Sequence, residues 1–427
     1  MKAKILIVGG GVMGTALATR VAHKTDPLRA PVVLCERDVI GAGSSGSSGG
    51  VLRQFYRDRL LALMARDSMH EYAQFEARTG RSIGYMRSGV MTLAGPEQAD
   101  WQAHIRKVVA DLSEVSINIR EVEGQELASL VPGIDIKPGT IGAWEPDGGF
   151  VDPVETMRAF AALARTYGTV TRLKTEVQEI HVKNGRVVGA RTNHGECQTE
   201  RIVLMGGAWT AKVLASLGVH IPLRVVRPEN YFFKMPELES SPVEEGASGN
   251  FGISFDMEDP FETQGLGGEM TALAGMHPVL IDLEHDFYAR CDPALGRTRV
   301  GRANYSNEKA VSDPDRVEDP DSSAGRSWAR DVLAKRMPEY QEREDAGEVS
   351  SFYTLTPDSQ PVIGPVPGIE GLFVATGFSG HGFKIAPSVG EGLAQMLFDE
   401  PVTAFEPEFF SPDRFTGKEE WRGQFGI

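Results

Sequence analysis

The chain has 427 residues, and at about 150 residues per domain this length favours two or three domains. Hydrophobic residues make up 41% of the chain and charged residues 24%, a balance that provides a substantial core and excludes a disordered polymer. The 44 basic and 59 acidic residues leave a formal charge of −15, which argues against a nucleic acid or an anionic membrane as partner, because both attract basic patches.

A βαβ unit opens the chain. Residues 5–8 (ILIV) form a continuous apolar run, typical of a parallel strand that is buried on both faces. Glycines end this run, and residues 12–23 predict a helix with several small side chains. Residues 32–35 (VVLC) predict a second buried strand, which ends at Glu36. The strand, the helix and the second strand fit within about 35 residues, as one βαβ unit requires.

The later elements alternate in type along the chain. A second glycine-rich stretch, 41–50, precedes a helix, and Asn184-Gly185 predicts a two-residue hairpin turn between two strands. Buried strands recur in the middle and near the end, so we expect the chain to return to one sheet and to build a second domain from the intervening pieces. We predict helices over 58–78, 154–167 and 386–398, and strands over 179–182, 186–188, 202–204 and 371–376.

Two acidic segments interrupt this pattern. Between Lys234 and Glu262, eight acidic residues accompany a single basic one, with prolines and glycines among them. This composition predicts a solvated insertion rather than core. Residues 313–323 form a second acidic turn region.

Cysteine usage and apolar run lengths bear on the compartment. Cys35, Cys197 and Cys291 lie far apart, which excludes a disulfide framework or a four-cysteine zinc site and is typical of a reducing compartment. No apolar stretch approaches the roughly 18 residues that a membrane span needs. The N-terminal apolar run is interrupted at Gly9, unlike a secretory signal. We therefore expect a cytoplasmic protein with no membrane span.

The first motif with chemical content is Gly9-x-Gly11-x-x-Gly14, placed between a strand and a helix. In such a motif the glycines permit a tight turn, close approach of the backbone to a pyrophosphate, and close packing of the helix on the sheet. Glu36 follows Gly14 by 22 residues, where a carboxylate accepts hydrogen bonds from an adenosine ribose. The alternative is a glycine turn without a ligand. The motif alone does not separate NAD from FAD.

The stretch 41–50 (GAGSSGSSGG) extends this N-terminal unit. It resembles the long fingerprint of glutathione-reductase-like FAD folds, in which a second glycine stretch lies along the flavin. A flexible serine–glycine linker is the alternative. Predicted elements abut the stretch on both sides, which disfavours a linker.

Together these motifs resemble those of the D-amino-acid-oxidase-like FAD oxidoreductases, in particular the glycine oxidase and monomeric sarcosine oxidase branch. The matching pieces recur in family order along nearly the whole chain, except for residues 234–275, which match nothing. Besides the N-terminal fingerprint they are 51–56 (VLRQFY), 148–153 (GGFVDP), 207–210 (GAWT), 353–358 (YTLTPD) and 377–384 (GFSGHGFK).

The resemblance implies an α/β fold, α+β overall, with a discontinuous domain and a second, smaller one. The larger is a Rossmann-like, glutathione-reductase-like FAD-binding domain; the smaller is a substrate domain with a mostly antiparallel sheet. We expect the FAD-binding domain to comprise residues 1–85, 145–220 and 350–427. We expect the substrate domain to comprise residues 86–144 and 221–349.

The resemblance also implies site residues. Arg53 and Lys384 match the two cations that bind the substrate carboxylate, and an arginine fork beside a lysine point charge suits that task. The alternative for Arg53 is a surface salt bridge. His381 lies in the loop 377–382, whose amides and following helix would stabilise charge on the reduced flavin; a purely structural histidine is equally consistent. The implied cofactor-binding residues are Gly9, Gly11, Val12, Met13, Gly14, Glu36, Arg37, Ser44, Ser45, Gly49, Gly50, Val177, Gly207, Trp209, Gly377, Gly380, His381, Gly382, Phe383 and Lys384.

Three departures from the family pattern matter. Ser351 stands where sarcosine oxidase carries the cysteine that links to the flavin, so we expect FAD held without a covalent bond. Gly50 replaces an arginine found beside the flavin in that branch. The lysine that activates oxygen in sarcosine oxidase has no recognisable counterpart, which leaves open whether oxygen or another acceptor takes the electrons.

Other constellations are weak. The nine histidines show no HxH or HExxH spacing, so no metal site is expected. Tyr231, His277, His285 and Tyr288 fall in the predicted substrate domain, where each is a candidate for the pocket, although a structural role is the favoured alternative.

The sequence therefore predicts an FAD-dependent oxidase or dehydrogenase for a small amine, an amino acid or N-alkyl amino acid, acting on a CH–NH or CH–NH2 group. One rival is an FAD-dependent 2-hydroxy-acid dehydrogenase, which shares the carboxylate clamp but needs a base for the hydroxyl proton. A second is a flavoprotein with mainly a binding or assembly role. A third is an NAD-dependent Rossmann enzyme.

Overall fold

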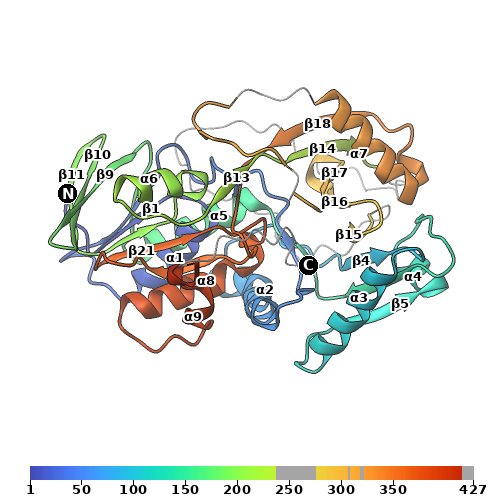
Figure 1. Cartoon of the computed structure of the whole chain (residues 1–427), viewed down its shortest axis with the longest axis horizontal. Helices are drawn as coiled ribbons and strands as arrows, with labels where there is room; N and C mark the ends of the chain where they lie inside the picture. Colours follow the sequence, from blue (N-terminus) through green and yellow to red (C-terminus); the bar gives the residue numbers. More distant parts are fainter. Residues whose placement is uncertain (237–275, 306–307, 318–321, 416–427) are drawn as a thin grey trace.

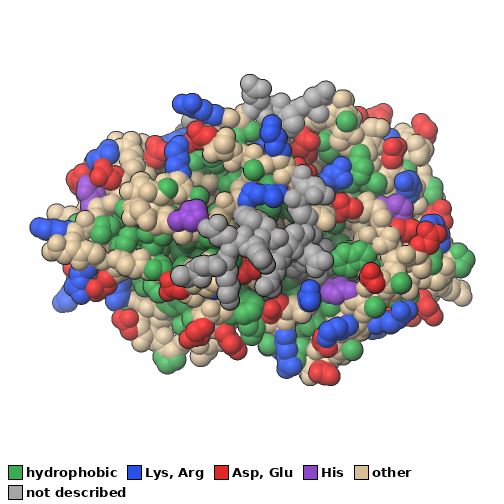
Figure 2. All heavy atoms as spheres, viewed as in Figure 1, with side chains coloured by type: hydrophobic (Ala, Val, Ile, Leu, Met, Phe, Trp, Pro, Cys, Tyr) green, Lys and Arg blue, Asp and Glu red, His purple; other side chains and the backbone are tan. Residues whose placement is uncertain are grey.

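A computed structural model describes residues 1–236, 276–305, 308–317 and 322–415. The predicted insertion lies mostly outside these residues. The elements divide between two large sheets that occupy different parts of the molecule (Figure 1). Acidic and basic side chains are interspersed on the face shown in Figure 2, without one dominant basic patch.

The first sheet has six strands in the order β20-β21-β12-β1-β2-β8. All neighbours are parallel except β20 and β21, as expected for buried β-branched strands fed by helical crossovers. Its strands are β1 (Ile5–Val8), β2 (Val32–Cys35), β8 (Val170–Arg172), β12 (Ile202–Leu204), β20 (Val362–Pro365) and β21 (Leu372–Thr376).

The second sheet has eight strands in the order β18-β14-β17-β16-β15-β4-β6-β5, antiparallel except where β15 meets β4. The predicted fold class, a Rossmann-like parallel sheet joined to an antiparallel one, is confirmed. The strands are β4 (Val90–Ala94), β5 (Arg120–Glu123), β6 (Ile141–Glu145), β14 (Glu229–Lys234), β15 (Val279–Asp282), β16 (Phe287–Asp292), β17 (Arg297–Arg302) and β18 (Asp345–Ser350).

Three small sheets complete the strands. The predicted hairpin forms, with Asn184 and Gly185 at φ of 51° and 73°, the left-handed conformation that a two-residue turn of this kind needs. The strands are β9 (Val177–Lys183), β10 (Arg186–Thr192) and β11 (Gly195–Gln198), then β3 (Val51–Leu52) with β7 (Gly149–Phe150), and β13 (Arg224–Val226) with β19 (Tyr353–Leu355).

Helix boundaries follow local capping chemistry. The side chain of Asp58 accepts the Leu60 N–H at 2.9 Å, so α2 begins at Arg59, and that of Asp152 accepts the Glu155 N–H at 2.8 Å to begin α5. The helices are α1 (Val12–Ala22), α2 (Arg59–Thr79), α3 (Ala99–Ser113), α4 (Gly124–Leu130), α5 (Pro153–Thr166), α6 (Thr210–Ser216), α7 (Ser323–Arg336), α8 (Gly382–Leu397) and α9 (Pro407–Phe410).

The predicted start of the last long helix near Ala386 was wrong, because α8 already begins at Gly382. Pro387 lies inside the helix and has no N–H for the carbonyl of Phe383. The hydroxyl of Tyr72 donates to that carbonyl instead, at 2.8 Å. Lys384 consequently lies in the first turn of α8 rather than in the preceding loop.

Within the described ranges, no helix is both long enough and apolar enough to cross a bilayer. The same residues contain no group of three or more histidine, cysteine, aspartate or glutamate side chains placed to hold a metal ion.

Candidate active site

Three neighbouring cavities join into one groove. The largest, of about 760 Å3, passes Glu36 and shares Ser45 with a second of about 130 Å3. The second cavity shares Phe383 with a third cavity of about 80 Å3, which Lys384 also lines. The groove therefore runs from the carboxyl end of β2 to the first turn of α8, and we refer to its two extremes as the nucleotide end and the substrate end.

Backbone geometry shapes the nucleotide end. Gly9 has a φ of 113°, and a Cβ on Gly14 would lie 1.9 Å from the Gly9 carbonyl oxygen, so only glycine lets α1 pack this closely on β1. Gly11 is the N-cap of α1 and has no side chain to cap the first turn. The Val12 N–H donates to the Ser45 hydroxyl at 3.1 Å, which fixes the second glycine-rich stretch against the first.

A carboxylate and an aromatic ring line the same end. Glu36 accepts the Gly10 N–H at 2.7 Å and faces the largest cavity. Val177 and Trp209 line it as well, and the guanidinium of Arg37 stacks 3.9 Å from the centre of the Trp209 ring.

Two helix N-termini meet in the middle of the groove. The first residues of α1 and the loop 377–382 that leads into α8 line the second cavity together. A Cβ on Gly382 would lie 3.0 Å from the Met13 Cε, so the two helix starts are in close contact. Since helix N-termini carry partial positive charge, this region favours an anionic group.

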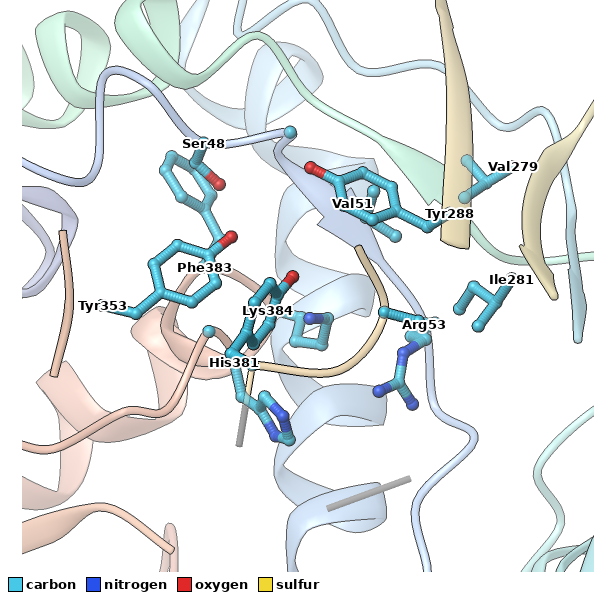
Figure 3. A pocket seen from close by; sticks show the side chains of 14 residues that line it. Ser48, Val51, Arg53, Val279, Ile281, Tyr288, Tyr353, His381, Phe383 and Lys384 are labelled. Carbon is cyan, nitrogen blue, oxygen red and sulfur yellow. The ribbon is translucent and has the colours of Figure 1, made fainter. Parts of the chain in front are cut away.

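Buried cations define the substrate end. Arg53 and Lys384 are 4% and 6% exposed, and both line the third cavity (Figure 3). The Arg53 guanidinium lies 4.7 Å from the centre of the Tyr56 ring and donates to the Phe55 carbonyl. Burial, and then repulsion from Arg53, hold the pKa of Lys384 well below its ordinary value. Two buried cations that face one small cavity fit an anionic ligand.

His381 lines the same cavity and is 5% exposed. Burial and the nearby Lys384 and Arg53 lower its pKa well below the ordinary value, so the imidazole is neutral at physiological pH. Its Nδ1 has no hydrogen-bond partner among the described residues. A neutral imidazole can accept a proton or a hydrogen bond.

The remaining walls are apolar and aromatic. Val279 and Ile281 of β15 lie on one side of the cavity, and Tyr353 lies across it (Figure 3). The rings of Tyr353 and Tyr305 meet edge to face with centres 4.7 Å apart, and Tyr288 donates from its hydroxyl to Asn230 at 2.5 Å. The cavity thus combines two cations with a hydrophobic surround, typical of a site for a small organic anion.

Most of the residues implied by the resemblance line this groove. The exceptions are Gly14, which packs against Gly9, and Gly50, whose φ is 59° and whose added Cβ would lie 2.3 Å from the Val151 carbonyl oxygen. The residues that the structure brings to the groove are Gly9, Gly11, Val12, Met13, Glu36, Arg37, Ser44, Ser45, Gly49, Arg53, Val177, Gly207, Trp209, Gly377, Gly380, His381, Gly382, Phe383 and Lys384.

Of the four candidates from the predicted substrate domain, Tyr231, His277, His285 and Tyr288, only Tyr288 lines the cavity. The Tyr231 hydroxyl donates to Glu229, and its side chain belongs to a separate core cluster. His277 is buried with its Nδ1 against the Pro278 carbonyl, and His285 bonds Asp282.

Sequence reasoning did not single out Glu145, Tyr305 or Asp315. Glu145 is fully buried behind Arg53, and Asp315 lines the nucleotide end of the groove. A lone acid at the end of the apolar run 141–144 was the only signal for Glu145.

The groove fits a dinucleotide. Gly11, which has no side chain, lines the groove at the start of α1, Glu36 is placed for a ribose, and two helix N-termini meet where a pyrophosphate would find positive potential.

Comparisons with known proteins agree with this geometry. The profile of the family described as "FAD dependent oxidoreductase" matches residues 4–396. Peroxisomal sarcosine oxidase of Homo sapiens is 25% identical over 92% of this chain and 91% of its own length. Mitochondrial dimethylglycine dehydrogenase of Mus musculus is 25% identical over 97% of this chain and 44% of its own length, so the chain spans less than half of that relative.

Solved structures share the fold. L-proline dehydrogenase from P. horikoshii matches with a TM-score of 0.80 at 22% identity, over 98% of this chain and 99% of its own. Glycine oxidase from Geobacillus kaustophilus matches with a TM-score of 0.75 at 22% identity, over 97% of this chain and 99% of its own.

Proposed function

Because the chain belongs to the family of FAD dependent oxidoreductases, as its sequence predicted, we propose that it oxidises a small amino acid or N-alkyl amino acid at the carbon beside nitrogen. The observation that carries this proposal is the pair of buried cations, Arg53 and Lys384, in one cavity at the end of the dinucleotide groove. A peroxisomal sarcosine oxidase and a dimethylglycine dehydrogenase among the relatives support the substrate class.

In this proposal the two cations fix the substrate carboxylate, and the apolar wall of Val279 and Ile281 excludes water from the rest of the substrate. The substrate nitrogen has to be neutral when it reacts, and the positive potential of Arg53 and Lys384 lowers the pKa of a bound ammonium group. Bound FAD supplies the acceptor for the hydride equivalent. The imine product then hydrolyses to a carbonyl compound and an amine or ammonia, and oxygen or another acceptor takes the electrons.

We propose that the cofactor is held without a covalent bond. Ser351 lies next to the second glycine-rich stretch, where its hydroxyl donates to the Ser44 carbonyl at 3.4 Å, and a hydroxyl cannot form a thioether. The three cysteines are buried, and only Cys35 lines the groove, at its nucleotide end. Acid precipitation should therefore release all of the yellow colour, whereas colour retained in the pellet would refute this point. Three free, buried cysteines also support the expected cytoplasmic location.

A second candidate function is oxidation of a 2-hydroxy acid. It is favoured by one observation: His381 lines the substrate cavity, and its Nδ1 has no hydrogen-bond partner within the part of the chain that the structure describes. Such a group can accept the hydroxyl proton that this reaction releases.

An anaerobic titration separates these functions. The FAD-loaded protein is mixed with a panel of amino acids, N-methyl amino acids and 2-hydroxy acids while the visible flavin bands are followed. Bleaching by amino acids or N-methyl amino acids is the expected result, and bleaching by hydroxy acids alone would favour the second candidate. Bound flavin that no compound reduces would indicate a binding or assembly role, and a colourless protein that binds NADH would overturn the FAD assignment.

A further inference from the structure

A buried acid lies behind the two cations. Glu145 ends β6 and is fully buried. Its register partner on β4 is Val90, which pairs in turn with Val279 of β15. Since paired residues of neighbouring strands share a face, Glu145 lies on the face of the eight-stranded sheet that also contributes Val279 to the substrate cavity.

One oxygen of Glu145 holds the segment that carries Arg53. Its Oε1 accepts the N–H groups of Gln54 and Phe55, the latter at 3.1 Å. These two residues directly follow Arg53, so the carboxylate fixes the segment from which the guanidinium extends. The other oxygen, Oε2, is buried and has no partner among the described residues.

The charge of Glu145 is balanced by the same cations that would bind the substrate. Among the described residues, three charged or titratable groups face Glu145: Arg53 and Tyr56 from the segment after β3, and Lys384 of α8. Its neighbour on β4 is the apolar Val90. Burial raises the pKa of Glu145 to about 7, against the opposing effect of the two N–H groups and both cations. An anion that binds between Arg53 and Lys384 cancels part of their stabilising effect on the Glu145 carboxylate.

We propose that Glu145 takes up one proton at Oε2 when a carboxylate ligand binds between Arg53 and Lys384. The proton comes from solvent when the ligand is a simple carboxylate. With an amino-acid substrate, the ammonium group of the substrate loses one proton while Glu145 gains one, so the site exchanges no net proton with solvent. Glu145 is thus a positioning residue for Arg53 and a proton store for the site. This inference rests on the proposed function, since it requires carboxylate binding at the two cations.

The test uses propionate, which has no oxidisable amine, and the FAD-loaded full chain. The dissociation constant is measured from the perturbation of the visible flavin spectrum between pH 6 and 9. Uptake of one proton predicts that Kd is nearly constant below about pH 7 and then rises about tenfold per pH unit. In Glu145→Gln, whose amide oxygen can still accept the N–H groups, the tenfold rise of Kd per pH unit should be lost.

A matched control is Glu155→Gln, since burial also raises the pKa of Glu155 to about 7 but its main charged neighbours are Asp152 and Arg158. In this variant the Kd of propionate should depend on pH as it does in the wild-type protein. A pH-independent wild-type Kd, or an unchanged slope in Glu145→Gln, would overturn the role of Glu145. Absence of propionate binding at every pH would instead overturn the carboxylate site and the proposed function with it.

A second measurement does not depend on the variant folding. In weakly buffered solution at pH 8, an indicator dye should report uptake of close to one proton per propionate bound by the wild-type protein. Binding without proton uptake would contradict the inference.

Discussion

The two ends of the groove are built by different means. At the nucleotide end, the glycine turn of Gly9, Gly11 and Gly14 and the carboxylate of Glu36 come from the first 36 residues, and their contacts involve backbone atoms. At the substrate end, Arg53 follows β3, Val279 lies on β15 and Lys384 lies on α8. The glycine turn of the nucleotide end is therefore specified by local sequence, whereas the substrate end depends on tertiary structure and on buried charge.

The substrate end should therefore be sensitive mainly to loss of charge, and the nucleotide end mainly to added side-chain volume. Removal of a charge at the substrate end should have the largest effect. In Arg53→Ala, only Lys384 remains to bind the substrate carboxylate. Loss of one member of a buried charged contact costs about 2–5 kcal/mol, so kcat/KM should fall by roughly 30- to 5,000-fold while flavin content stays the same.

Steady-state kinetics and the ratio of visible to ultraviolet absorbance check this expectation. Arg66→Ala is the control, because Arg66 is an exposed arginine on α2 that pairs with Asp67. Unchanged kinetics in Arg53→Ala would remove Arg53 from the site.

At the nucleotide end, the largest effect should come from an added methyl group. In Gly14→Ala the new Cβ meets the Gly9 carbonyl oxygen, a backbone atom that cannot move without separating α1 from β1. Overpacking of this kind costs about 1–3 kcal/mol, so the thermal midpoint of the flavin-free protein should fall.

Gly11→Ala sharpens the contrast. A Cβ there meets only the Ser45 hydroxyl, at 3.0 Å, so the flavin-free protein should keep its stability and lose affinity for FAD through obstruction of the groove. Equal thermal midpoints for the two flavin-free variants would contradict the assigned difference between packing and cofactor approach.

The same contrast explains what the sequence could predict. The strand–glycine–helix unit and the hairpin at Asn184-Gly185 follow from contiguous residues, and the structure contains both. The start of α8 depends on a hydroxyl from Tyr72, more than 300 residues away from Phe383, so local pattern placed it too late. Glu145 lies near Arg53 because β7, which follows it in the chain, pairs with β3 and places Gly149 opposite Leu52, a pairing with no signature in either strand alone.

Removal of charge at the nucleotide end should have a smaller effect. Glu36→Gln retains one side-chain oxygen for the Gly10 N–H but loses the second oxygen, which accepts the Asp38 N–H at 2.8 Å, and the negative charge that would attract ribose hydroxyls. One exchanged hydrogen bond is worth about 1 kcal/mol, so the dissociation constant of FAD should rise about fivefold. Quenching of flavin fluorescence on reconstitution measures it, with Glu370→Gln as the control, because Glu370 is an exposed carboxylate that pairs with Arg186 and does not line the groove. A loss of 100-fold or more would show that this end depends on charge as strongly as the substrate end does.

The smallest effect is expected at Asp315, which lines the nucleotide end from the acidic segment that the sequence marked only as a turn. Its carboxylate accepts hydrogen bonds from Lys212 at 3.0 Å, Arg37 at 2.9 Å and the Trp209 ring N–H at 2.8 Å. The hydrogen bonds from Lys212 and Arg37 are the main reason that its pKa falls to about 2. The charge is therefore present at every pH above that value and is lost only in strong acid.

The Asp315 side chain is 38% exposed, so solvent screens these pairs and each contributes less than about 1 kcal/mol. Asp315→Asn should accordingly speed release of FAD by no more than about fivefold, as measured by recovery of flavin fluorescence after dilution. Added salt should speed release from the wild type and reduce the difference from the variant, because exposed ion pairs are screened. A rate of FAD release that does not depend on salt, or that is unchanged in the variant, would mean that the segment with Asp315 does not restrain the cofactor. Backbone contacts alone would then retain FAD at the nucleotide end.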